Sequence, residues 1–149
     1  MDTYQREERQ HWLSVLARAE YMNLEKRWDA LSMLPEYTMV RAPEIGLAQV
    51  RGRMGGAGRA FNVGDVTVTR AVIRLKTGEM GFSYVTGRNK SHAELIAVVD
   101  ALMQTDARAQ LNEQLIIPLA AEKRAQEEAR AKEVLASKVD FFTMVRGED

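Results

Sequence analysis

Two neighbouring strand-like runs constrain the fold of this chain more than any other feature. The run DVTVTRAVIRL at 65–75 alternates with the period of a strand, and EMGFSYVTG follows it at 79–87. The turn predicted between them, at Thr77-Gly78, is too short for a parallel crossover. The two runs therefore predict an antiparallel hairpin around which the rest of the chain must fold.

One face of this hairpin is expected to be apolar. Pairing across Thr77-Gly78 places Lys76 opposite Glu79, an opposite-charge pair that closes the turn. We expect helices to pack on the apolar face, whose pairs are Leu75 with Met80, Ile73 with Phe82, and Ala71 with Tyr84.

The other face carries two arginines, Arg70 and Arg74. The same pairing sets Arg74 opposite Gly81, Val72 opposite Ser83, and Arg70 opposite Val85. A guanidinium group with space beside it can bind a phosphate or a carboxylate through two hydrogen bonds. Alternatively, both side chains simply extend into water from a solvated face.

Further strands and helices are expected before the hairpin. The runs YTMVRA and EIGLAQVRGRM resemble strands broken at Pro43, which brings the sheet to about four strands. A helical period occupies 6–20, and a second short helix should be capped by Asn23 and ended by Pro35.

The helical period returns after the hairpin. Ser91 and Glu94 form a capping-box pattern, and Asp106 is expected to cap a short helix. Pro118 suits the first turn of a long helix that runs to about Lys138 and precedes the apolar tail VDFFTMVRGED.

These elements predict a single α+β domain over 1–149. Its antiparallel sheet of about four strands should carry helices on one face. The long C-terminal helix and apolar tail, 118–149, should form an appendage that binds a partner.

Composition limits the chemistry of the chain. Its 149 residues have a formal net charge of +0, which argues against a general nucleic-acid binder, because such binding depends on surplus basic charge. With 0 cysteines and 2 histidines that lack metal-ligand spacing, we predict no thiolate chemistry, no metal site and no catalytic residue. The polar N-terminus and the lack of a long apolar run are typical of a cytoplasmic protein.

The segment RGRMGGAGR at 51–59 concentrates glycine and arginine. It leads into a strand and lacks the lysine and hydroxyl residue of a P-loop, so neither a P-loop nor a dinucleotide fingerprint fits. Its amides can form an anion-binding nest, with Arg51, Arg53 and Arg59 as candidate ligands. Alternatively, the glycines only turn the chain.

Two further segments are candidate binding sites. GRNKSHAE places Arg88, Lys90 and His92 at a helix N-terminus, where free amides favour anions, although a solvated loop explains the pattern equally well. The apolar tail either folds back on the core or docks on another protein. Without that partner, it could join two copies in a homodimer. The docking candidates are Phe141, Phe142, Met144 and Val145.

Several segments together resemble the PhnG family, the G subunit of the bacterial carbon–phosphorus lyase. They are HWLSVLA, RMGGAGRAF with VGDVTVTRAVIRL, GEMGFSYVTGRNKSHAEL with DALMQ, and VDFFTMVRG, in the family's order over about 11–147. Ala57 departs from the family pattern, which has a threonine between the loop glycines, and this puts a hydroxyl contact there in question.

The resemblance implies a subunit of a cytoplasmic complex for phosphonate catabolism. With the I, H and L subunits, the G subunit would support a transferase reaction that moves the ribose 5-triphosphate of ATP from adenine to methylphosphonate. It implies direct contact with the I subunit, with H, J and L in the assembly. ATP would be a substrate of the complex and no cofactor would reside in this chain, because the iron–sulfur cluster and S-adenosylmethionine belong to the J subunit. The alternative is a free-standing regulatory or nucleic-acid-binding module.

Overall fold

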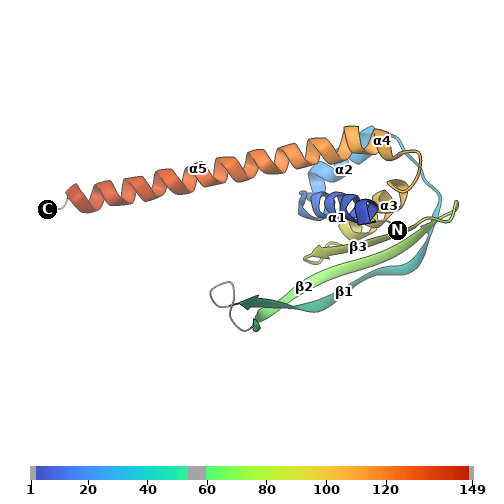
Figure 1. The fold of residues 1–149 in the computed structure, drawn as a ribbon, viewed down its shortest axis with the longest axis horizontal. Coiled ribbons are helices and arrows are strands. Elements are labelled where there is room, and N and C mark those ends of the chain that lie inside the picture. Colours follow the sequence, from blue (N-terminus) through green and yellow to red (C-terminus); the bar gives the residue numbers. More distant parts are fainter. Residues whose placement is uncertain (1–2, 54–59, 148–149) are drawn as a thin grey trace.

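A three-stranded antiparallel sheet with helices on one face organises the chain (Figure 1). The computed structural model describes residues 3–53 and 60–147. The α+β prediction is confirmed, and the sheet has three strands, in the order β1-β2-β3, where about four were expected.

The missing fourth strand is explained by Pro43, which does not break β1 (Tyr37–Arg53). The pairing of β1 with β2 shifts register between Met39 and Arg41 and again between Arg41 and Glu44. Because β1 is an edge strand and the chain bulges here, a proline without an amide hydrogen is accommodated. The two predicted runs are therefore one bent strand.

The hairpin of β2 (Ala60–Leu75) and β3 (Met80–Thr86) is confirmed, but its predicted register is wrong by one residue. The turn has three residues, since the Leu75 amide donates to the Glu79 carbonyl at 2.9 Å. Gly78 has φ of 110°, the left-handed conformation typical of such a turn. Arg74 therefore pairs with Met80, and Arg70 pairs with Tyr84.

This shift exchanges the two faces of β3. Gly81, Ser83 and Val85 are buried under the helices, while Phe82 and Tyr84 lie on the opposite face. The prediction that Phe82 and Tyr84 pack on the helices is wrong. A Cβ atom at Gly81 would lie 1.7 Å from the carbonyl oxygen of Ala97, so the helix above rests directly on this glycine.

Two helices precede the sheet. The first, α1 (Thr3–Arg18), buries Trp12 and Leu16, and α2 (Tyr21–Ala30) buries Leu24. Asn23 does not cap α2, because the Leu24 amide already donates to the Glu20 carbonyl at 3.0 Å within the first turn. The helix thus begins earlier than predicted.

The helix that follows the sheet, α3 (Lys90–Leu102), lies on β2 and β3 and is mostly buried. Its N-cap is Asn89, not Ser91, because the Asn89 side chain accepts the amide of His92 at 3.0 Å. Glu94 is engaged elsewhere, accepting a hydrogen bond from Tyr37 at 2.6 Å. The predicted capping box is therefore wrong.

The C-terminal helical segments follow one another without a break. They are α4 (Arg108–Leu111), the π-helical turn η2 (Asn112–Ile116) and α5 (Ile117–Gly147). Ala107, not Asp106, is the residue before α4. Pro118 lies in the first turn of α5 as predicted, and the wide η2 turn before it gives room for a residue that lacks an amide hydrogen.

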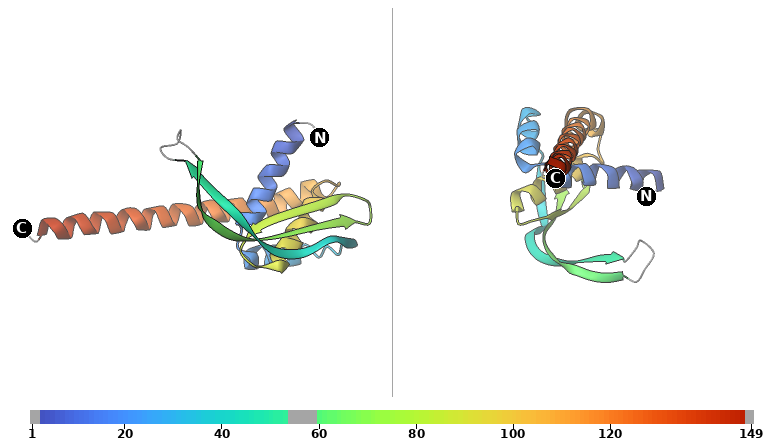
Figure 2. Two further views of the ribbon diagram at one scale, coloured as in Figure 1. Left: turned by 90° about the horizontal axis from the view of Figure 1, so that it is seen from below. Right: turned by 90° about the vertical axis from the view of Figure 1, so that its left-hand side faces the viewer.

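Two segments project from the body of the molecule (Figures 1 and 2). Helix α5 continues through Gly147, so the predicted separate tail after Lys138 is wrong, and its far part extends away from the other helices. Strands β1 and β2 also continue as a two-stranded arm beyond the end of β3.

Candidate interaction surfaces

Asp100 of α3 fixes the edge of the sheet and was not singled out by sequence reasoning. It is fully buried and accepts both guanidinium hydrogen bonds of Arg9, at 3.1 and 2.7 Å. It also accepts the Trp12 indole N–H at 2.8 Å and the Phe82 amide at 2.9 Å. The signal was a single carboxylate in the apolar run LIAVVDALM at 95–103. Because Phe82 belongs to the edge strand β3, this hub holds the sheet against α1 and α3.

The sheet face opposite the helices forms the first candidate surface. This outer sheet face is defined by Arg70, Val72, Arg74, Phe82 and Tyr84. Phe82 is 45% exposed and Tyr84 is 54% exposed. Aromatic and arginine side chains are the types enriched in protein interfaces, so the composition of this face suits a partner.

The two arginines of the outer sheet face differ in their surroundings. Arg70 lies 3.4 Å from the Glu44 carboxylate, which Arg41 also approaches at 3.6 Å. Arg74 forms no ion pair among the described residues and lines a pocket at the turn end of the sheet. Of the pair, Arg74 is therefore the more available to an incoming anion.

The predicted cluster at the N-terminus of α3 is divided between surface and core. Arg88 and Lys90 are exposed, whereas His92 is only 6% exposed. The His92 Nε2 lies 3.0 Å from the Leu16 carbonyl oxygen, and its ring contacts Tyr21. Burial lowers the pKa of His92, with the Leu16 carbonyl acting in the opposite direction. His92 thus joins α3 to α1 inside the protein.

The structure does not bring the predicted basic residues into one site. The backbone of Arg51 and Arg53 lies in the β1 arm, and Arg59 lies outside the described residues. Arg88 lies two residues after the end of β3, while Arg74 pairs with the first residue of β3. At the usual rise of a strand, these two ends are about 20 Å apart. Arg74 and Arg88, both in the described part of the chain, therefore lie too far apart to share one anion.

The projecting part of α5 is the second candidate surface. Its described apolar side chains, Val134, Leu135, Val139 and Phe141, are each 60 to 63% exposed. Phe142, Met144 and Val145 continue the same helix, and their side chains lie outside the described part. The predicted docking segment therefore does not fold back on the core in the part that is described.

The described residues contain no group of three or more metal-ligating side chains that could hold an ion. Within the same residues, no helix combines the length and apolar character that a bilayer crossing requires.

Comparison with known proteins identifies the family. The family model for the phosphonate metabolism protein PhnG matches residues 7–147. The chain belongs to the PhnG family. It is 46% identical over 142 residues to the alpha-D-ribose 1-methylphosphonate 5-triphosphate synthase subunit PhnG of Rhizobium meliloti (strain 1021). That alignment covers 95% of this chain and 91% of the relative. Membership in the PhnG family places the chain in phosphonate metabolism, and its relative is one subunit of a larger enzyme.

Proposed function

We propose that this PhnG-family chain is an accessory subunit of a carbon–phosphorus lyase complex and is not catalytic alone. In that complex it supports transfer of the ribose 5-triphosphate of ATP from adenine to methylphosphonate. The family match and the name of the relative support this assignment. The observation that carries it is the projecting part of α5, whose large apolar side chains are exposed. Such groups usually mark a protein interface.

The two candidate surfaces bind other subunits, and exposed basic side chains attract the substrates. The apolar end of α5 and the outer sheet face dock on other subunits, the I subunit first among them, with H, J and L in the assembly. Arg74, Arg88 and Lys90 are basic side chains without a carboxylate partner in the described part of the chain. Because ATP and the product are polyanions, these cations guide them towards the assembled site.

This chain contributes no cofactor of its own. ATP is a substrate of the complex, and the iron–sulfur cluster and S-adenosylmethionine belong to the J subunit. The role of the chain is assembly and electrostatic guidance in the cytoplasm.

Co-expression with the I subunit of the same organism tests the proposal. A tagged full-length chain should purify with the I subunit in a fixed ratio. A tagged chain ending at Glu127 should retain much less of the I subunit. Failure of the full chain to bind any of the I, H, J or L subunits, while remaining folded, would contradict the proposal. Salt-sensitive RNA or DNA binding by such a chain would favour the regulatory or nucleic-acid-binding alternative.

The steering role needs its own variant. In the assembled complex, Arg74→Ala should lower turnover about threefold at low salt and less at high salt, because screening weakens long-range attraction. Arg6→Ala removes an exposed arginine of α1 and is the matched control. Equal turnover of the two variants would remove steering from the proposal.

A further inference from the structure

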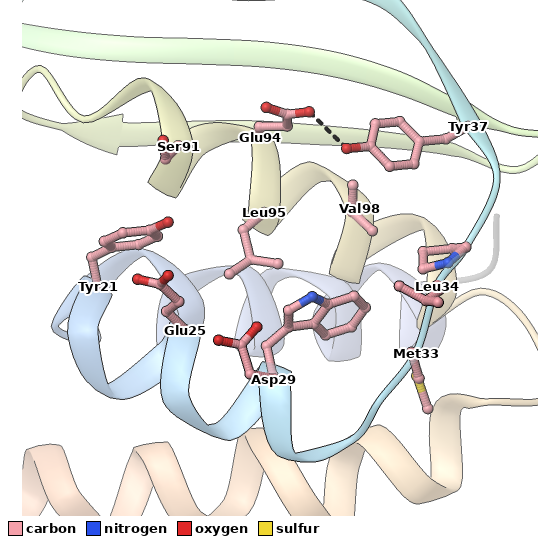
Figure 3. A pocket seen from close by; sticks show the side chains of 12 residues that line it. Tyr21, Glu25, Asp29, Met33, Leu34, Tyr37, Ser91, Glu94, Leu95 and Val98 are labelled. Atoms are coloured by element: carbon pink, nitrogen blue, oxygen red, sulfur yellow. Dashed lines mark hydrogen bonds between the residues drawn. The ribbon is translucent and has the colours of Figure 1, made fainter.

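A groove of about 420 Å³ lies between α2 and α3, at the start of β1 (Figure 3). Its volume is within the range of pockets that enclose a small ligand or a single side chain. Tyr21 and Ser91 lie at one end of it, and Met33 and Leu34 lie at the other. Both helices and the segment that joins α2 to β1 therefore contribute to its walls.

A strained turn shapes one end of the groove. Ser32 follows α2 with φ of 53°, a left-handed conformation that favours glycine, and its amide donates to the Asp29 carbonyl at 3.2 Å. This turn directs the next residues across the end of the groove, where Leu34 remains 93% exposed. An apolar rim is thus held open to solvent.

The groove is negatively charged. Glu25 and Asp29 project from α2, and Glu94 projects from α3 (Figure 3). None of the three forms an ion pair with a described residue, and no lysine or arginine is among the lining residues. The groove therefore repels phosphates and carboxylates and attracts cations.

Glu94 is held in place by Tyr37. The Tyr37 hydroxyl donates to Glu94 Oε1 at 2.6 Å. Burial, together with the hydrogen bond and the negative charge of Glu94, raises the pKa of Tyr37 to about 12. Tyr37 therefore remains a donor, and the second oxygen of Glu94 is left for a ligand.

Aromatic rings complete the walls, because Tyr21, Trp28 and Tyr37 line the groove beside the carboxylates. A guanidinium group stacks on aromatic faces and donates to carboxylates at the same time, which a compact ammonium does less well. We propose that this groove receives an arginine side chain from a partner subunit of the complex. The inference rests on the proposed function, and charge complementarity with aromatic walls identifies the occupant.

Titration of the full chain with N-acetyl-arginine amide tests the groove by NMR. The Trp28 indole signal and the amides of 25–37 should shift, while the indole of Trp12, which is 4% exposed, should not. N-acetyl-citrulline amide has nearly the same shape without the charge and should bind at least fivefold more weakly. Equal shifts with both probes, or none with the arginine probe, would overturn the proposal. Tighter binding of a third probe, N-acetyl-lysine amide, would also overturn it, because the groove would then prefer an ammonium to a guanidinium group.

A double variant separates this inference from the proposed function. Glu25→Gln with Asp29→Asn changes two exposed side chains and should weaken arginine binding about three- to tenfold. Asp106→Asn with Glu113→Gln removes the same charge from exposed positions outside the groove and should leave binding unchanged.

The same variants decide the occupant in co-expression with the I, H and J subunits. If the wild-type chain assembles and the groove variant assembles less well than its control, the groove binds a partner. Equal assembly of both variants would overturn the partner assignment while the proposed function stands. Failure of the wild-type chain to assemble would contradict the proposed function. In that case the arginine titration would still test whether the groove binds a guanidinium group. Self-association lost in the groove variant would identify a second copy as the occupant and overturn the assignment.

Discussion

Helices α3 and α5 show two opposite uses of a helix in one small protein. Eight of the 13 residues of α3 are buried. The helix packs so closely on the sheet that a Cβ atom at Gly81 would collide with the backbone of Ala97. In contrast, α5 has 31 residues, and Leu119 is the one buried side chain in its described part. Since burial of apolar surface is the main stabilising term, α3 should determine stability while α5 is available for binding.

The largest loss of stability should follow from changing the buried carboxylate of α3. Asp100→Ala removes the acceptor of the Trp12 indole and the Phe82 amide and leaves the charge of Arg9 unpaired. We expect unfolding free energy to fall by about 4 kcal/mol in urea denaturation. Asp140→Asn, an exposed change on α5, is the control and should cost less than about 0.5 kcal/mol. Similar losses in both variants would contradict the contrast between the helices.

Close contact between α3 and the sheet gives the next largest effect. The methyl group of Gly81→Ala would collide with the Ala97 backbone, so we expect a loss of about 3 kcal/mol. Gly46→Ala is a matched control on β1, because a Cβ there meets nothing within 4 Å. A thermal unfolding midpoint for Gly81→Ala equal to that of Gly46→Ala would show that α3 is not seated on Gly81.

The contact between Gly81 and α3 also explains why the register of β3 could not be predicted from the sequence. Period and turn length predicted the hairpin and the inward face of β2, because these follow from local pattern. The turn contains one more residue than predicted, Lys76, and this shifts the register of β3 by one. Every side chain of β3 therefore lies on the face opposite to the predicted one, including Phe82 and Tyr84. Only the packed helix distinguishes the two registers, since Gly81 and Ser83 allow the close approach and a phenylalanine does not.

The candidate sites were harder to predict than the fold. Basic residues close in the sequence were separated by the sheet, and His92 proved to be a core residue between α1 and α3. The acidic groove escaped notice because its walls come from three segments, with Glu25 and Glu94 far apart in the chain. Pairing of distant elements is not encoded in local periodicity. By contrast, the apolar residues near the end of α5 were recognised from the sequence because they lie close together in it, and their docking on a partner stays a prediction.

Protonation of His92 should give a smaller, pH-dependent loss. The folded pKa is lowered by burial, so the unfolded chain binds this proton more readily. The contribution of His92 is therefore fully present above the unfolded value near 6.5 and is lost as the pH falls below it. We expect unfolding free energy to decline from pH 7 to pH 5 by at most about 1.4 kcal/mol per pH unit from this group. His92→Gln should flatten that decline, and an unchanged slope would assign it to other groups.

Removal of the far part of α5 should have the smallest effect on stability. The segment after Glu127 is exposed wherever its side chains are described, so a chain ending at Glu127 loses little buried area. We expect its unfolding free energy to stay within about 0.5 kcal/mol of the full chain in urea, with lower helix content by circular dichroism. The same truncation should nearly abolish binding to the I subunit. A large loss of stability would make this segment part of the fold, and the separation between a stabilising helix and a binding helix would fail.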